Sequence, residues 1–155
     1  MAYTGHLTGQ NPLLFITIKR EDQKQQLCQA ISRIWESPEF LIKEDIRSVI
    51  AHLIEHCLQG QNIHPDILII DLEICSLDAQ ALFETVRSIT GLRHTPILAL
   101  VDVACADLRD HMYDAGADLV IAWEHLETRM GDIAGLAVDN WLNTDPEQEY
   151  LPQSI

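Results

Sequence analysis

Short apolar runs alternate along the chain with longer stretches in which apolar residues recur every three or four positions. The short runs have strand length and lie at 13–18, 40–42, 67–70, 97–101 and 119–122. The longer stretches predict amphipathic helices at 22–36, 45–60, 78–89, 104–114 and 126–142. Because the run at 67–70 has no polar position, we expect it to form a strand that is buried on both faces.

Polar residues and glycines mark the expected helix ends. Asp22, Asp45 and Asp78 are expected to begin helices, because a carboxylate can accept the free N–H groups of a first turn. Gly60 and Gly116 are expected to end two helices, since glycine readily adopts the left-handed conformation that follows many helices.

The alternation of five strands with five helices predicts an α/β domain. We expect a doubly wound, five-stranded parallel sheet of flavodoxin-like strand order 2-1-3-4-5, with helices on both faces. The 155 residues suffice for one such domain, which we place at 12–142. Residues 1–11 are then an N-terminal extension, and 143–155 are expected to be a mobile acidic tail.

Charge and composition exclude several classes of function. The formal net charge is −14, so the surface should repel nucleic acids and anionic membranes. There is no run of 18 apolar residues, and the four cysteines form no Cys-x-x-Cys pair. The first ten residues lack the basic and apolar regions of a signal peptide, so we expect none there. The sequence therefore predicts a cytoplasmic protein with reduced cysteines.

Asp71 is the position of greatest chemical interest. It directly follows the buried run at 67–70, at the end of the expected third strand. In a doubly wound sheet, function sits outside the carboxyl ends of the strands, beside the switch point between strands one and three. The loops after Ile18, Ile70 and Val101 should meet there, which is the layout of a phospho-accepting aspartate.

Three stretches carry a resemblance to the receiver domains of two-component response regulators. Residues 65–78, PDILIIDLEICSLD, are similar to the family's strand three, acceptor aspartate and following loop. Residues 95–100, TPILAL, resemble strand four, and residues 115–118, AGAD, resemble the turn into strand five. The resemblance covers about residues 12–142, and it implies a phosphorelay signalling module.

Asp71 matches the family's phospho-acceptor, but the residues expected around it differ. The acidic pair that holds Mg²⁺ in the family matches Lys19 and Arg20. The hydroxyl residue of strand four matches Val101, and the lysine after strand five matches Trp123. The switch aromatic residue of strand five matches Val120.

These replacements bear directly on the chemistry. Mg²⁺ takes hard oxygen ligands, and the cations at 19 and 20 would repel it. Phosphoryl transfer needs its developing charge neutralised by metal and lysine, so both losses should cost several kcal/mol of transition-state stabilisation. Val101 has no hydroxyl group to bind a phosphoryl oxygen. The resemblance therefore implies a pseudo-receiver, which keeps the fold, loses the phosphorylation chemistry and needs no cofactor.

Other interpretations of this edge remain open. Asp71 is also interpreted as one half of a structural ion pair with Lys19. In a second interpretation it is a working phospho-acceptor, with Glu21 and Asp22 as displaced Mg²⁺ ligands beside it. In a third, Lys19 and Arg20 bind a phosphate-like anion in a sensor site.

His52, Glu55 and His56 match the H-x-x-E-H pattern of inverted zinc peptidases. The two histidines stand four residues apart and could share a metal ion on one face of a helix. A hydrolase would need a third protein ligand, and this helix is expected on the flank of the sheet, away from the carboxyl edge. We therefore favour solvated histidines over a zinc site.

The sequence thus predicts a stand-alone signalling module that is not an enzyme and binds a protein partner independently of phosphorylation and Mg²⁺. The resemblance places the contact surface on the last two helices and the last strand. Candidate residues there are Arg109, Tyr113, Trp123 and Trp141. Trp123 is interpreted first as a packing residue, and a homodimer is a further candidate assembly.

Overall fold

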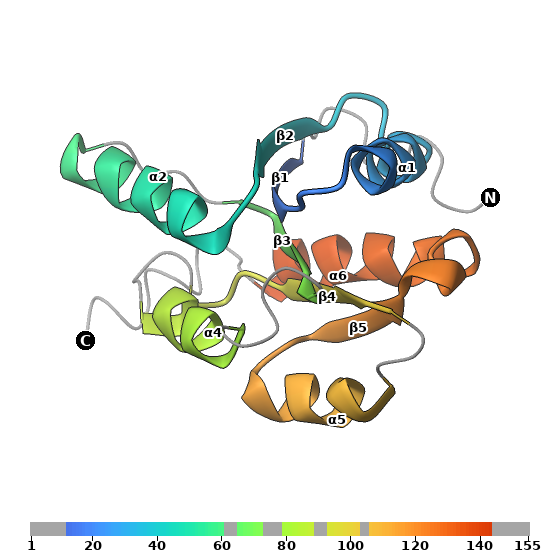
Figure 1. Cartoon of the computed structure of the whole chain (residues 1–155). Helices are drawn as coiled ribbons and strands as arrows, with labels where there is room; N and C mark the ends of the chain where they lie inside the picture. Colours follow the sequence, from blue (N-terminus) through green and yellow to red (C-terminus); the bar gives the residue numbers. More distant parts are fainter. Residues whose placement is uncertain (1–11, 61–64, 73–78, 89–92, 103–105, 144–155) are drawn as a thin grey trace.

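A parallel β-sheet forms the centre of the molecule (Figure 1). The computed structural model describes residues 12–60, 65–72, 79–88, 93–102 and 106–143. Within these residues the strands are β1 (Leu13–Thr17), β2 (Glu39–Lys43), β3 (Ile67–Asp71), β4 (Ile97–Val101) and β5 (Leu119–Ala122). They pair in parallel in the order β2-β1-β3-β4-β5, which confirms the predicted flavodoxin-like topology.

Helices follow the strands in the expected alternation. They are α1 (Glu21–Ser32), α2 (Ile46–Leu58), α4 (Ala79–Ser88), α5 (Ala106–Ala115) and α6 (Met130–Asn143). Two short 3-10 turns, η2 (Trp123–His125) and η3 (Glu127–Arg129), lie between β5 and α6. The predicted extension at 1–11 and the predicted tail from residue 144 lie outside the described residues.

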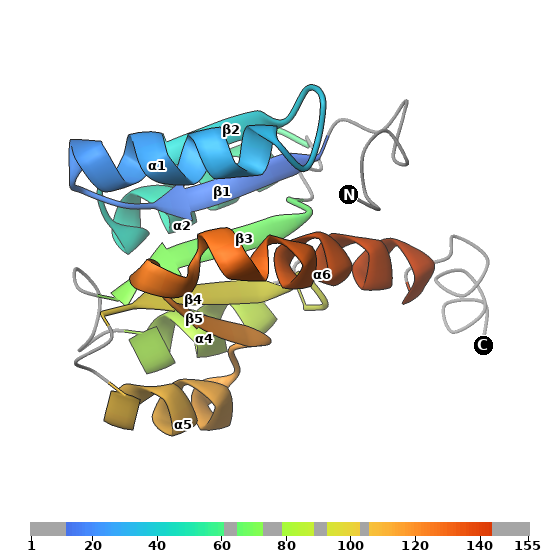
Figure 2. The ribbon, with the colours of Figure 1, turned by 90° about the vertical axis from the view of Figure 1, so that its right-hand side faces the viewer.

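The sheet separates two hydrophobic cores. Figure 2 shows α1 and α6 in front of the sheet, with α2 and α4 behind it. The core under α1 and α6 includes Ile16, Ile69 and Ile121, whereas the core on the other face includes Phe15 and Ile70. Neighbouring residues of one strand thus enter opposite cores, as the period of two requires. All five residues of β3 are buried, as its apolar run predicts.

The first helix differs from its prediction at both ends. It begins at Glu21 with Arg20 in the N-cap position, so the predicted capping by Asp22 is wrong. Glu21 and Asp22 instead lie in the first turn, where negative charge is favourable beside the free N–H groups. The helix ends at Ser32, four residues before its predicted end. Ile34 and Trp35 are buried, but they belong to a turn that follows the helix.

The helix ends predicted at Asp45, Gly60 and Gly116 are confirmed. The N–H of Ser48 donates to Asp45 Oδ1 over 2.8 Å, and this bond lowers the pKa of the Asp45 carboxyl. Gly116 follows α5 with φ +126°, and Gly60 lies shortly after α2 with φ +77°. Position 116 needs glycine, because other residues rarely adopt a φ of +126°. The predicted helix start at Asp78 lies outside the described residues.

Two further expectations concern the environment of the chain. No helix in the described part of the chain is long and apolar enough to cross a membrane. Cys28 is a free, partly buried thiol. The side chains of the other three cysteines lie outside what the structure describes.

Candidate functional site

Asp71 is the last residue of β3, at the carboxyl edge of the sheet. The strand register pairs Asp71 with Leu100, and Leu100 with Ile121. Because side chains alternate along a strand, Asp71 lies on the same sheet face as Ile69, which is the face covered by α1 and α6. Its side chain is only 1% exposed, so this acidic group is held away from bulk water.

Trp123 follows β5 and reaches this aspartate. Trp123 lies two residues beyond Ile121, so it faces the same core as Asp71. Its indole N–H donates a long hydrogen bond to Asp71, with Nε1 3.4 Å from Oδ1. Trp123 is 8% exposed, which agrees with its interpretation as a packing residue and removes it from the candidate interface anchors.

Lys19 and Arg20 occupy the loop between β1 and α1, and both are exposed. Asp71 is buried, so the structural ion pair between Lys19 and Asp71 stays a prediction. The Arg20 Nε lies 4.0 Å from Asp22 Oδ1, on the exposed surface. An exposed ammonium group keeps its hydration in solvent, whereas pairing with Asp71 would require its burial.

Mg²⁺ is the cofactor that the resemblance associates with this edge, and the described acidic residues of α1 are not grouped with Asp71 to hold it. Glu21 Oε1 lies 2.8 Å from Lys24 Nζ on the surface of α1, and this bond lowers the pKa of the Glu21 carboxyl. No three His, Cys, Asp or Glu residues of the described chain are grouped as a metal site. The predicted displaced ligand set of Glu21, Asp22 and Asp71 is therefore not assembled.

The positions that match the family's switch are apolar and buried. Val101 is 2% exposed and Val120 is fully buried, and both belong to the core on the side of α2 and α4. The backbone of Val120 is held from outside the sheet, since its N–H donates to the hydroxyl oxygen of Tyr113 over 3.0 Å. Arg129 Nη1 donates to the carbonyl oxygen of Val120 over 3.4 Å. Val120 itself is not aromatic, and the aromatic residue that contacts β5 here is Tyr113 of α5.

The remaining interface candidates differ in accessibility. Tyr113 is 40% exposed, and Arg109 is partly buried on the same helix. The side chain of Trp141 lies outside the described residues, although its backbone belongs to α6.

The histidine motif on α2, weighed above as a less favoured zinc site, is not grouped with a third ligand among the described residues. The rings of His52 and His56 are stacked at a tilt with centroids 4.1 Å apart, and His56 Nδ1 lies 2.9 Å from the carbonyl oxygen of His52. Glu55 is exposed and supplies no third ligand among the described residues. Burial, followed by the neighbouring charges of His56 and Lys43, lowers the pKa of His52.

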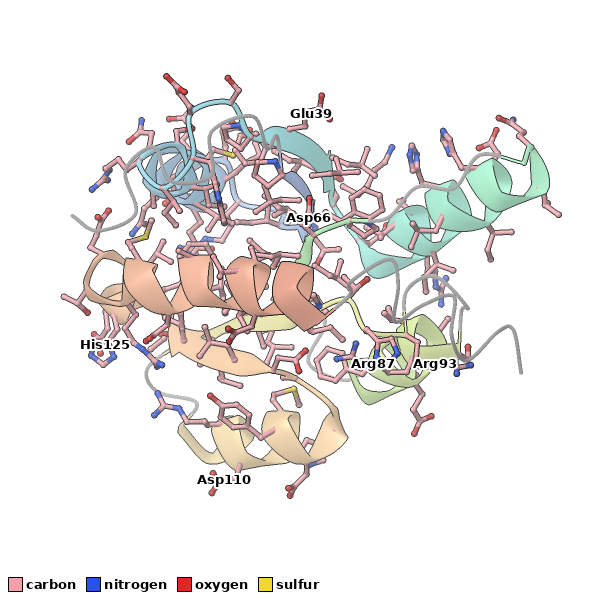
Figure 3. The ribbon with its side chains drawn as sticks, turned by 180° about the vertical axis from the view of Figure 1, so that it is seen from behind. Glu39, Asp66, Arg87, Arg93, Asp110 and His125 are labelled. Carbon is pink, nitrogen blue, oxygen red and sulfur yellow. The ribbon has the colours of Figure 1, made fainter. Side chains whose placement is uncertain are left out.

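One polar cluster was not predicted from the sequence. The guanidinium of Arg87, labelled in Figure 3, donates to Asp118 Oδ2 over 2.8 Å and to the carbonyl oxygen of Thr95 over 2.6 Å. It also donates to the carbonyl oxygens of Arg93 and Gly116. This cluster ties α4 to the start of β4 and to the turn before β5. In the sequence, only the aspartate of the turn at 115–118, Asp118, could have indicated this cluster.

Solved structures of known proteins share this arrangement of strands and helices. The phosphorylated cyanobacterial phytochrome response regulator RcpA matches with a TM-score of 0.66 and 18% identity, over 88% of this chain and 97% of its own. Response regulator RPA3017 of R. palustris matches with a TM-score of 0.63 and 19% identity, over 81% of this chain and 90% of its own. The chain has the receiver fold of response regulators. Chemotaxis response regulator CheY4 of Vibrio cholerae gives a TM-score of 0.60 and 16% identity, over 80% of this chain and 99% of its own.

The receiver fold is established here by structure. No protein-family model matches the chain, and a search of curated proteins found no match. At identities below 20% the likeness shows how the chain folds, so its chemistry must be argued from its own residues. Asp71 ends β3 in this fold with the indole of Trp123 beside it, and their match to the family's acceptor and lysine stays a prediction.

Proposed function

We propose that this chain is a cytoplasmic, receiver-like signalling module that binds a protein partner without being phosphorylated, without Mg²⁺ and without catalysing a reaction. The observation that carries this proposal is the contact between Trp123 and Asp71. A neutral indole supplies the hydrogen bond at the place where the family's lysine would supply a positive charge.

The electrostatics of the site support the loss of phosphorylation. A phosphoryl group would bring close to two negative charges to a carboxylate that is 1% exposed. Neutralising that charge requires cations, and the described residues form no metal site while Lys19 is exposed to solvent. Val101 offers no hydroxyl donor to a phosphoryl oxygen. Without groups to neutralise a phosphoryl charge, Asp71 is suited to a domain that keeps one conformation.

A module that is not switched by phosphorylation would present the same binding surface to its partner at all times. The family resemblance points to α5, β5 and α6, and the exposed side chain of Tyr113 lies on this face with the partly buried Arg109 beside it. The hydroxyl of Tyr113 is fixed by the backbone N–H of Val120, so the ring cannot move between strand and solvent without losing that bond. We propose this α5–β5–α6 face as the binding surface.

The proposal is tested by incubating the protein with Mg²⁺ and a small-molecule phosphodonor and measuring its intact mass. We expect no added phosphoryl group, and the variant Asp71→Asn should behave identically. A reconstructed variant, with Lys19→Asp, Arg20→Asp, Val101→Thr and Trp123→Lys, is expected to gain a phosphoryl group. Labelling of the unaltered protein that disappears in Asp71→Asn would overturn the proposal.

Partner binding is tested separately with immobilised protein. Asp71→Asn should capture the same partner with the same affinity as the unaltered chain, because the partner does not sense the acceptor. Tyr113→Ala should weaken that binding by about ten-fold or more, as expected for an aromatic residue in an interface. Binding that depends on Asp71 but not on Tyr113 would contradict the proposed surface.

A further inference from the structure

The outer edge of β2 pairs with no further strand among the described residues. Figure 1 shows β2 at the end of the sheet opposite β5. The N–H of Glu39 and the carbonyl oxygen of Lys43 form hydrogen bonds on the β1 side of the strand. Because peptide groups alternate along a strand, those of Phe40 and Ile42 point away from β1. Among the described residues no other element donates or accepts a hydrogen bond there.

The opposite edge of the sheet is protected at Val120. On β5 the N–H of Val120 donates to the hydroxyl oxygen of Tyr113, and its carbonyl oxygen accepts from Arg129. Side chains thus occupy the peptide group that faces away from β4, which is a common protection against pairing with another strand. The described part of β2 has no such protection.

The sequence of β2 is complementary to itself when it is reversed. The strand reads Glu39-Phe40-Leu41-Ile42-Lys43, with an acid at one end and a base at the other. If a second strand runs antiparallel and is centred on Leu41, Glu39 lies opposite Lys43 of the second copy and Phe40 lies opposite Ile42. Opposite charges and apolar pairs that face each other directly stabilise antiparallel strands.

We propose that a second copy of this chain docks on β2 by antiparallel pairing centred on Leu41, and extends the sheet across a two-fold axis. The outward peptide groups of Phe40 and Ile42 exchange hydrogen bonds with those of Ile42 and Phe40 in the other copy. A two-fold axis perpendicular to the sheet keeps each face continuous, so both copies of α1 lie on one side and both copies of α2 on the other. Such an interface uses the same patch twice.

Burial and charge favour this occupant. Phe40, Leu41 and Ile42 are only partly buried although they pack against the two cores, so strand pairing would cover apolar surface that solvent now reaches. Glu39 is exposed, and Figure 3 shows it at the outer margin of β2, pointing away from the domain. Two chains of net charge −14 repel each other, whereas this pairing places an acid beside a base at both ends.

The dimer is expected to be weak, because a five-residue edge buries less surface than a standard interface. Sedimentation equilibrium of the full chain at about 0.15 M salt and up to about 1 mM protein is the test, since salt screens the long-range repulsion beyond about 8 Å. The unaltered chain should approach twice the mass of one chain. Glu39→Lys and Lys43→Glu should each dimerise about ten-fold more weakly, because like charges then face each other.

Mixing the two variants provides a decisive control. In a mixed pair, the lysines of Glu39→Lys face the glutamates of Lys43→Glu, so a 1:1 mixture should associate as strongly as the unaltered chain. Recovery in the mixture also shows that both variants are folded. The exposed Asp110 on α5 provides a matched control, since Asp110→Lys changes the charge equally and should leave association unchanged.

Three results would overturn the proposal. One is an unaltered chain that stays monomeric over the whole concentration range. The second is a mixture that associates no better than either variant alone. The third is association that Asp110→Lys abolishes and Glu39→Lys does not, since that would place the contact on α5.

Discussion

The indole N–H of Trp123 points at the buried carboxylate of Asp71, with 3.4 Å between Nε1 and Oδ1. The two residues are 52 positions apart in the sequence, and the parallel register of β3, β4 and β5 brings them to the same edge and face of the sheet. This contact places a neutral donor beside a buried aspartate at the carboxyl edge of a receiver fold.

Replacing Trp123, whose indole donates to Asp71, should lower the free energy of unfolding more than replacing Trp35. Trp123→Phe takes one donor from a buried carboxylate, whereas Trp35, which is 2% exposed, has a buried Nε1 with no hydrogen-bond partner among the described residues. Both changes remove similar apolar volume. We expect Trp123→Phe to lower the free energy of unfolding by about 1 kcal/mol more than Trp35→Phe, measured by urea denaturation. Equal losses would show that Trp123 acts through packing alone.

The edge of β5 should open when the Tyr113 hydroxyl is removed. Tyr113→Phe keeps the ring and deletes the acceptor of the Val120 N–H. We expect faster hydrogen exchange at the Val120 amide and a stability loss of about 1 kcal/mol. Amide exchange followed by NMR measures this directly, with the central β3 amides as an internal reference. Unchanged protection of Val120 would mean that the hydroxyl does not hold the edge.

The arginine cluster at Arg87 should contribute measurably to stability. Its guanidinium donates to Asp118 and to three carbonyl oxygens, and its side chain is 30% exposed. Arg87→Met should lower the free energy of unfolding by about 2 kcal/mol, since several acceptors lose a charged donor together. Arg47→Met, at an exposed position of α2, is the matched control and should change stability little. Equal effects of the two changes would argue against the cluster.

His52 should make the fold less stable as the pH falls. Its pKa is lowered in the folded state from an ordinary value of 6.5, first by burial and then by the charges of His56 and Lys43. The unfolded chain therefore binds more protons just below pH 6.5, and stability declines as the pH falls through that range. His52→Gln should flatten this part of the pH profile of the urea midpoint. His111→Gln, at an exposed position of α5, should leave the decline in place.

The sequence predicted the sheet well because its signals are local. The uninterrupted apolar run before Asp71 marks a strand with two buried faces, and the bond of Asp45 to Ser48 depends on residues three positions apart. Such features need no knowledge of the rest of the fold. The place of Asp71 at the carboxyl edge followed from strand order alone.

The bonds that distinguish the site could not be predicted in the same way. Trp123 reaches Asp71, and Tyr113 reaches the backbone of Val120, only once side-chain directions are fixed by packing. The predicted pair of Lys19 and Asp71 shows the same limit, because sequence adjacency to the site does not say whether a side chain turns inward, and Lys19 is exposed. The early end of α1 depends on a turn whose buried residues share the spacing of a helix.

The central claim is that the Asp71 edge no longer responds to a phosphoryl group. The most direct test is the amide and indole NMR spectrum of the protein with Mg²⁺ and beryllofluoride, a mimic of the phosphoryl group on an acceptor carboxylate. The account predicts that the resonances of Asp71, Val101 and the Trp123 indole stay where they are. Saturable shifts of these resonances that require Mg²⁺ and vanish in Asp71→Asn would contradict it.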